Sequence, residues 1–148
     1  MRAVLDTNVL ARAIIASRGP AAACVDALEA SGHVLLLSSF IVAELRRILA
    51  YPRLRAIHGR GDDELEKLVA DLADGTEPVV LSGAALPGVV VGDPDDEAIV
   101  ATAVLGKADV LCTLDRDLRH PAVVEYCATR GVRVLTDVEL LALLRAPV

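Results

Sequence analysis

Acidic side chains recur in this sequence where apolar segments begin or end. Asp6 follows the first apolar run, Asp96 precedes the segment AIVATAVL, and Asp115 follows the run VLCTL. Glu44 lies inside the helical pattern FIVAELRRIL and borders its apolar face. Carboxylates brought within ~5 Å repel one another by roughly 3 kcal/mol per pair at an effective dielectric of 20, so a cluster needs cations or protons to persist.

The ligand types predict which cation such a cluster would hold. Oxygen ligation without His or Cys indicates Mg²⁺ or Mn²⁺ rather than zinc. Hard ions held by carboxylates at the end of a parallel sheet most often serve phosphoryl chemistry. We therefore expect a phosphate ester as substrate, with no nucleophilic side chain.

Each acid also has a purely structural interpretation. Asp6 could cap the helix that begins near Asn8. Acids in the segment DPDDE would complement the dipole of a helix start, and Asp115 and Asp117 could form an Asx turn. Glu44 is the hardest to explain in this way, because its helix neighbours are apolar.

The composition favours a sheet flanked by helices. Hydrophobic residues make up 54% of the 148 residues and aromatic residues only 2%, so the core must be aliphatic, as in a buried parallel sheet. One Phe and no Trp argue against a base-stacking module such as an OB-fold. Cys24, Cys112 and Cys127 are widely spaced in apolar sequence and are expected to be buried thiols in a reducing compartment.

Charge and targeting signals limit where the protein is expected to act and what it is expected to bind. The first apolar run is interrupted by Asp6, Asn8 and Arg12, and the longest uncharged stretch, residues 78–92, is too short to span a bilayer. We expect a cytoplasmic protein that does not contact a membrane. A net charge of −6 provides no general attraction to nucleic acid, so the distribution of charge matters more than its sum.

Strand-like and helical patterns alternate along the chain. This order predicts a single domain over residues 1–148, a three-layer α/β/α sandwich with a central parallel sheet of four or five strands. An arginine-rich connection is expected after Pro52, and residues 78–91 are the most ambiguous segment. The expected strands are 2–6, 33–38, 108–114 and 132–136, and the expected helices are 8–17, 20–30, 40–51, 62–74, 93–107, a helix within 115–131, and 137–144.

Four short segments in order resemble the motifs of PIN-domain ribonucleases, especially those related to VapC-type toxins. They are LDTNVL, AEL, DPDDEAIVATA and TLDRDL, and together they extend over most of the chain. Each motif alone is weak, whereas the ordered set is specific. Leu114 departs from the pattern, because the family usually has a small residue there.

The resemblance implies roles for individual residues. Asp6, Glu44, Asp96 and Asp115 match the metal-binding catalytic acids of the family, and Asp117 matches a frequent auxiliary ligand. The register of the third motif selects Asp96, which leaves Asp93 and Asp95 as helix-start residues. The polar residues that match those orienting the site are Asn8 and Thr113.

The resemblance also implies a function. It indicates an endoribonuclease that uses Mg²⁺ or Mn²⁺ to hydrolyse single-stranded RNA, acts as the toxin of a toxin–antitoxin pair, binds a cognate antitoxin and forms a homodimer. The basic run that follows Glu44 could hold the RNA backbone, although a solvated helix face is the alternative. The arginines expected to bind RNA are Arg46, Arg47, Arg53 and Arg55, and the run continues to Arg60.

Two other functions remain open on the sequence. A haloacid-dehalogenase-like phosphatase also places an Asp after its first strand, but it needs a second acid where this chain has Asn8. It also needs a lysine from a later segment, and only Lys67 and Lys107 are available. A non-catalytic PIN-like binding module is the second alternative, although such modules have usually lost the acids.

Overall fold

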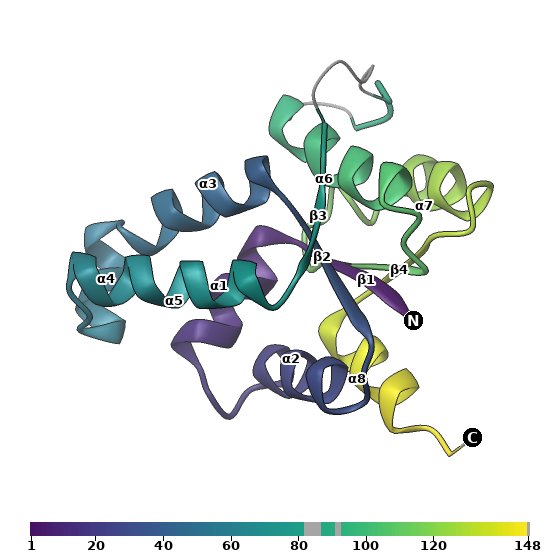
Figure 1. Ribbon diagram of the computed structural model, residues 1–148. Coiled ribbons are helices and arrows are strands. Elements are labelled where there is room, and N and C mark those ends of the chain that lie inside the picture. Colours follow the sequence, from purple (N-terminus) through teal and green to yellow (C-terminus); the bar gives the residue numbers. More distant parts are fainter. Residues whose placement is uncertain (82–86, 91–92, 148) are drawn as a thin grey trace.

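The computed structural model describes residues 1–81, 87–90 and 93–147. Its centre is a five-stranded sheet in which all paired strands are parallel, in the order β3-β2-β1-β4-β5 (Figure 1). The sheet confirms the predicted architecture. Its strands are β1 (Arg2–Leu5), β2 (Val34–Ser38), β3 (Glu77–Val79), β4 (Val110–Cys112) and β5 (Arg133–Leu135).

Helices cover both faces of this sheet. Figure 1 shows α6 and α7 on one side of the strands and α2 and α8 on the other. Helix α1 packs on α2 and on α3, which extends the second layer. The helices are α1 (Thr7–Ile15), α2 (Pro20–Ala30), α3 (Ser39–Leu49), α4 (Pro52–His58), α5 (Asp62–Asp74), α6 (Pro94–Leu105), α7 (Pro121–Ala128) and α8 (Asp137–Arg145).

The neighbouring inner strands β1 and β4 are the most deeply buried part of the sheet. Ala3, Val4 and Leu5 of β1 and the whole of β4 are inaccessible to solvent. Strands buried on both faces need continuous apolar runs, and the aliphatic composition provides them. The three cysteines are free and buried, as expected.

Two segments differ from the sequence-based expectation. The arginine-rich connection after Pro52 is largely helical, because Pro52 occupies the first position of α4 instead of only ending α3. The short strand β3 (Glu77–Val79) covers only the first two residues of the ambiguous segment 78–91. Residues 82–86 and 91–92 lie outside the described part of the chain.

The strand order places the ends of β1 and β4 side by side. Chain connections run outward from β1 to β2 and β3, and then return to β4 on the other side of β1. Ligands in open α/β sheets bind where the order reverses in this way, beyond the carboxyl ends of the strands. Leu5 pairs with Cys112, so Asp6 and Thr113 are the next residues on the two strands.

Candidate metal centre and basic groove

Asp6 lies at the junction of β1 and α1 and points into the site. It occupies the N-cap position of α1, but its side chain makes no capping hydrogen bond. Instead, its Oδ2 accepts a hydrogen bond of 2.8 Å from the Thr113 hydroxyl. Helix capping therefore does not explain this acid.

Burial changes the acidity of Asp6. The residue is only 4% exposed. Its pKa is raised to about 6, and burial is the largest cause. The hydrogen bond from Thr113 lowers the pKa, whereas the nearby charges of Asp115 and Glu44 raise it further. Proximity to two other carboxylates is what the predicted acid cluster requires.

The turn after β4 is held together by side-chain hydrogen bonds. The Thr113 hydroxyl accepts from the backbone N–H of Asp115 at 3.0 Å, while it donates to Asp6. Asp115 Oδ1 accepts from the N–H of Asp117 at 2.8 Å, which is the Asx-turn contact. The turn thus orders Asp115 and joins it to Asp6 through one hydroxyl group.

Asp96 comes from the first turn of α6. Asp93 caps this helix by accepting from the N–H of Asp95 at 3.0 Å, and Asp96 is then turned inward and is 9% exposed. One carboxylate oxygen of Asp96 lies within 4.8 Å of one from Asp115 and one from Asp117. The acids of DPDDE therefore separate into helix-start residues and one residue of the cluster.

One oxygen of the Asp96 carboxylate lacks a hydrogen-bond partner among the described residues. This oxygen, Oδ2, is buried. Burial raises the pKa of Asp96 to about 7, and the charge of Asp115 is the next largest cause. A buried acceptor without a partner costs free energy unless another group, such as a cation, satisfies it.

Glu44 comes from α3, and its charge acts on Asp6. Its Oε2 accepts from the Thr7 hydroxyl at 2.9 Å, and Arg47 Nη2 lies 3.6 Å from its Oε1. Glu44 and Asp6 are not members of the 4.8 Å group formed by Asp96, Asp115 and Asp117. The charge of Asp6 acts on Asp96 of the cluster, and the charge of Glu44 acts on Asp6.

Two further residues support the site and were not assigned a role from the sequence. Thr7 orients Glu44 as described. Glu97 is 6% exposed and accepts from the backbone N–H groups of Gly88 at 2.9 Å and Val90 at 2.6 Å, so it holds the preceding loop against α6. The only signals in the sequence were a polar residue within LDTNV and one more acid in a helix start.

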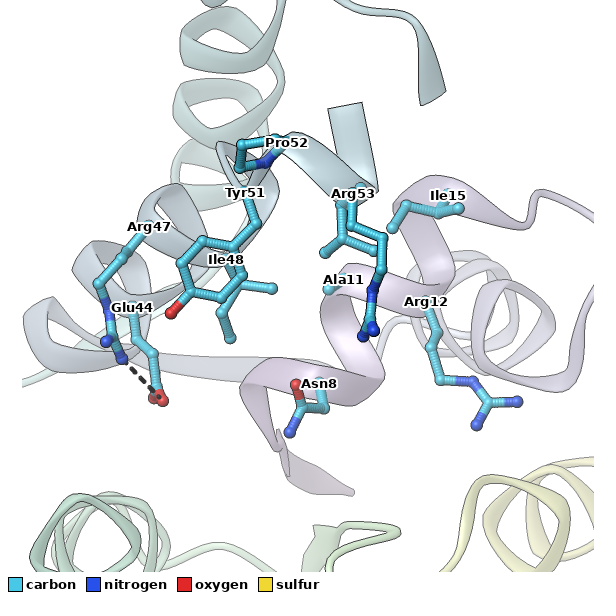
Figure 2. A pocket seen from close by; sticks show the side chains of 11 residues that line it. Asn8, Ala11, Arg12, Ile15, Glu44, Arg47, Ile48, Tyr51, Pro52 and Arg53 are labelled. Carbon is cyan, nitrogen blue, oxygen red and sulfur yellow. Dashed lines mark ion pairs between the residues drawn. The ribbon is translucent and has the colours of Figure 1, made fainter. Parts of the chain in front are cut away.

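A groove of about 700 Å³ lies between α1, α3 and α4 and includes Glu44 in its lining. Figure 2 shows Asn8 and Arg12 entering it from α1, Glu44 and Arg47 from α3, and Arg53 from α4. Three arginines and one acid line this basic groove in a chain whose net charge is −6. Arg12 was not among the residues expected to bind RNA.

The structure separates the four arginines that were predicted to act together. Arg47 and Arg53 line the basic groove, whereas Arg46 pairs with Glu66 at 2.7 Å and Arg55 pairs with Asp62. Adjacent residues on an α-helix point about 100° apart, so Arg46 and Arg47 face different neighbours. RNA binding by these four arginines stays a prediction, and the structure places only Arg47 and Arg53 of them in the basic groove.

The residues of the site fit a hard divalent cation. The cluster consists of carboxylates alone, and one buried carboxylate oxygen has no partner among the described residues. The three cysteines are not part of this group, and oxygen ligands are those that Mg²⁺ and Mn²⁺ prefer.

Comparison with known proteins agrees with this arrangement. The sequence matches the PIN domain family over residues 2–117. The chain belongs to the PIN-domain family. The family match covers β1 to the turn after β4, and so includes Asp6, Glu44, Asp96 and Asp115.

A solved structure shares the fold of this PIN domain. One chain of the crystal structure of VapBC2 from Rickettsia felis, bound to a DNA fragment from their promoter, superposes with a TM-score of 0.62 at 17% sequence identity. The match covers 92% of this chain and 98% of that chain. No curated protein sequence matches significantly. Within the described residues, none of the helices of this PIN domain is both long and apolar enough to cross a membrane.

Proposed function

We propose that this PIN domain is a metal-dependent endoribonuclease that cleaves single-stranded RNA. The observation that carries the proposal is the three-carboxylate cluster at the switch point of the sheet, with a buried oxygen of Asp96 that has no partner among the described residues. Nuclease chemistry is the activity of the family, and an acid cluster next to a basic groove suits an anionic phosphodiester.

The proposed ion is Mg²⁺ or Mn²⁺. Asp96, Asp115 and Asp117 would hold it, while Asp6 and Glu44 complete the charge around it. When bound, such an ion polarises the phosphodiester and lowers the pKa of an attacking water.

The other residues of the chain position these groups and the substrate. Thr113 fixes the Asp6 carboxylate, and Thr7 fixes that of Glu44. Asn8 lines the basic groove, where its amide can donate to a phosphate or a ribose oxygen. Arg12, Arg47 and Arg53 provide positive charge for the RNA backbone.

We further propose that the protein is the toxin of a toxin–antitoxin pair in the cytoplasm, with an antitoxin protein as partner. The support is the fold shared with a chain of the VapBC2 complex and the resemblance of the motifs to VapC-type toxins. A homodimer and a single PIN domain over residues 1–148 belong to the same proposal. Pairing of β5 with β4 in one sheet supports the domain limits, although β5 lies beyond the family match.

Neither alternative function has comparable support. The chain belongs to the PIN family, not to the dehalogenase-like phosphatases, and Lys107 follows the end of α6 opposite to Asp96. A non-catalytic module would have no use for a buried carboxylate oxygen without a partner, which costs stability.

An RNA cleavage assay with Asp96→Asn tests the nuclease proposal. The wild-type protein should cleave single-stranded RNA with Mn²⁺ and lose this activity with a chelator. Asp96→Asn should lower the cleavage rate by more than about 100-fold, since it removes a proposed ion ligand. Asp95→Asn makes the same change of charge at the exposed neighbour and should keep the rate.

Titration of the metal-free protein with Mn²⁺ in a calorimeter separates metal binding from catalysis. Wild type and Asp95→Asn should bind the ion, and Asp96→Asn should bind it more weakly. Equal cleavage by both variants would refute the assignment of Asp96. Hydrolysis of a small phosphate ester, with RNA left intact, would favour a phosphatase.

A further inference from the structure

We propose that Tyr51 forms a base-stacking subsite in the basic groove, where it receives a nucleobase of the bound single-stranded RNA. This inference rests on the proposed ribonuclease function and adds to it a residue that contacts a base instead of the backbone. It is argued from three observations: the position of the groove, the exposure of Tyr51 and the way its backbone is held.

The basic groove includes one of the proposed catalytic acids, Glu44. Asn8, which also lines it, follows Asp6 by two positions, and Tyr51 lines the groove where α3 gives way to α4. An RNA strand with a phosphate at the acids would therefore extend along the groove towards Tyr51. Figure 2 shows the Tyr51 ring between the side chains of Arg47 and Arg53.

Tyr51 is the aromatic side chain that is free to stack. It is 45% exposed, so a large part of its side chain is accessible to a ligand in the groove. The chain has only two other aromatic residues. Phe40 packs partly against the core, and the ring of Tyr126 is covered by the Arg130 guanidinium at 3.6 Å from its centroid.

The backbone holds Tyr51 in place. Its N–H donates to the carbonyl of Ile48 at 3.1 Å, and its own carbonyl accepts from the N–H groups of Leu54 at 3.0 Å and Arg55 at 2.9 Å. Pro52 follows it at the first position of α4 and restricts the chain further. With the backbone held in this way, only the two side-chain torsions of Tyr51 have to be ordered when a base stacks on its ring.

The combination of side chains fits single-stranded nucleic acid. Non-duplex strands are bound where cationic residues follow the phosphates and an aromatic ring stacks on an unpaired base. Arg12, Arg47 and Arg53 provide the first element and Tyr51 the second. Apolar side chains from α1, α3 and α4 also line the groove, but its three arginines favour an anionic occupant, so RNA is the occupant that the charge favours.

Tyrosine fluorescence reports on this subsite directly. The chain has no Trp and two tyrosines, so Tyr126→Phe leaves Tyr51 as the only tyrosine. We would titrate this variant with a short single-stranded oligoribonucleotide in the presence of a chelator, which prevents cleavage. A matched oligonucleotide of the same length with abasic residues keeps the phosphates and removes the bases. The proposal predicts quenching by the first and not by the second.

Binding affinities of Tyr51 variants provide the second readout. Tyr51→Leu should weaken binding of the oligoribonucleotide about tenfold and leave binding of the abasic strand unchanged, whereas Tyr51→Phe should bind both as the wild type does. Thermal melting checks that each variant is folded. Quenching and affinity that are the same for the normal and the abasic strand would overturn the proposal, and this is the result expected if the groove binds a protein segment instead. A Tyr51→Leu variant that loses equal affinity for both strands would also overturn it.

The same experiment distinguishes this inference from the proposed function. Base-dependent quenching is measured without catalysis, so it answers the question of the subsite even if the protein does not cleave RNA. Absence of cleavage with Mn²⁺ would overturn the ribonuclease proposal alone. Cleavage together with base-independent binding would overturn the subsite alone.

Discussion

At the scale of single residues, one threonine connects two segments that are 107 positions apart. The Thr113 hydroxyl donates to Asp6 and accepts from the N–H of Asp115, so both acids depend on it for their orientation. Removal of a group that hydrogen-bonds a metal ligand commonly lowers metal affinity or activity by about 10- to 100-fold. Thr113 is accordingly a positioning residue.

Thr113→Val tests this role. The substitution keeps the shape and removes the hydroxyl, so we expect Mn²⁺ affinity and cleavage rate to fall by about 10- to 100-fold. Thr113→Ser should restore both, because it returns the hydroxyl. Calorimetric titration with Mn²⁺ and the RNA assay measure the two quantities. A Val variant that loses only thermal stability would show that Thr113 is merely structural.

At the scale of elements, the beginning of α6 is constructed from acids with different tasks. Asp93 caps the helix, Asp96 joins the acid cluster, and Glu97 binds two N–H groups of the preceding loop. Asp93 has its role because it precedes the helix with an extended backbone. Asp96 and Glu97 face different neighbours because successive helix side chains point about 100° apart. The loop and the helix start therefore support the placement of Asp96 together.

Glu97→Gln should destabilise the protein. A glutamine offers one carbonyl oxygen in place of two carboxylate oxygens, which leaves either the Gly88 or the Val90 N–H without its partner. We expect the free energy of unfolding to fall by about 1–3 kcal/mol, measured by urea denaturation. The matched substitution Glu125→Gln, at an exposed position of α7, should change it by less than about 0.5 kcal/mol. Equal effects would contradict the assigned role of Glu97.

At the scale of the whole molecule, the acid cluster makes stability depend on protons and metal. The pKa values of Asp6 and Asp96 are raised from the ordinary 3.8 to about 6 and about 7. Between about pH 4 and pH 7, the metal-free folded protein therefore binds more protons than the unfolded chain does. The contribution of these groups to stability is therefore largest below about pH 4 and is lost as the pH rises to about 7.

Thermal melting at pH 5 and pH 8 checks this coupling. In a chelator, the melting temperature of Asp96→Asn should exceed that of the wild type by more at pH 8 than at pH 5. Mg²⁺ should raise the wild-type value more at pH 8, because fewer protons compete for the carboxylates. Each 1 kcal/mol corresponds to about 2–4 °C in a domain of this size. Shifts that are the same at both pH values would contradict the coupling of the cluster to protons.

The sequence by itself determined the order of the elements, the parallel sheet and the positions of the acids at strand ends. These features follow from local chemistry: aliphatic runs, Pro and Gly at helix boundaries, and polar residues where a buried strand must end. Helix α4 was missed because a short helix rich in arginine has no apolar periodicity of its own, and no residue of it is buried.

Only the tertiary structure decided which of these acids meet and which arginines share a surface. It placed Asp96, Asp115 and Asp117 within one cluster, left Asp6 and Glu44 outside it, and turned Arg47 but not Arg46 into the groove. Such outcomes depend on the rotation of each helix against its neighbours and on strand register. Both are set by packing between residues far apart in the chain, which no local pattern encodes.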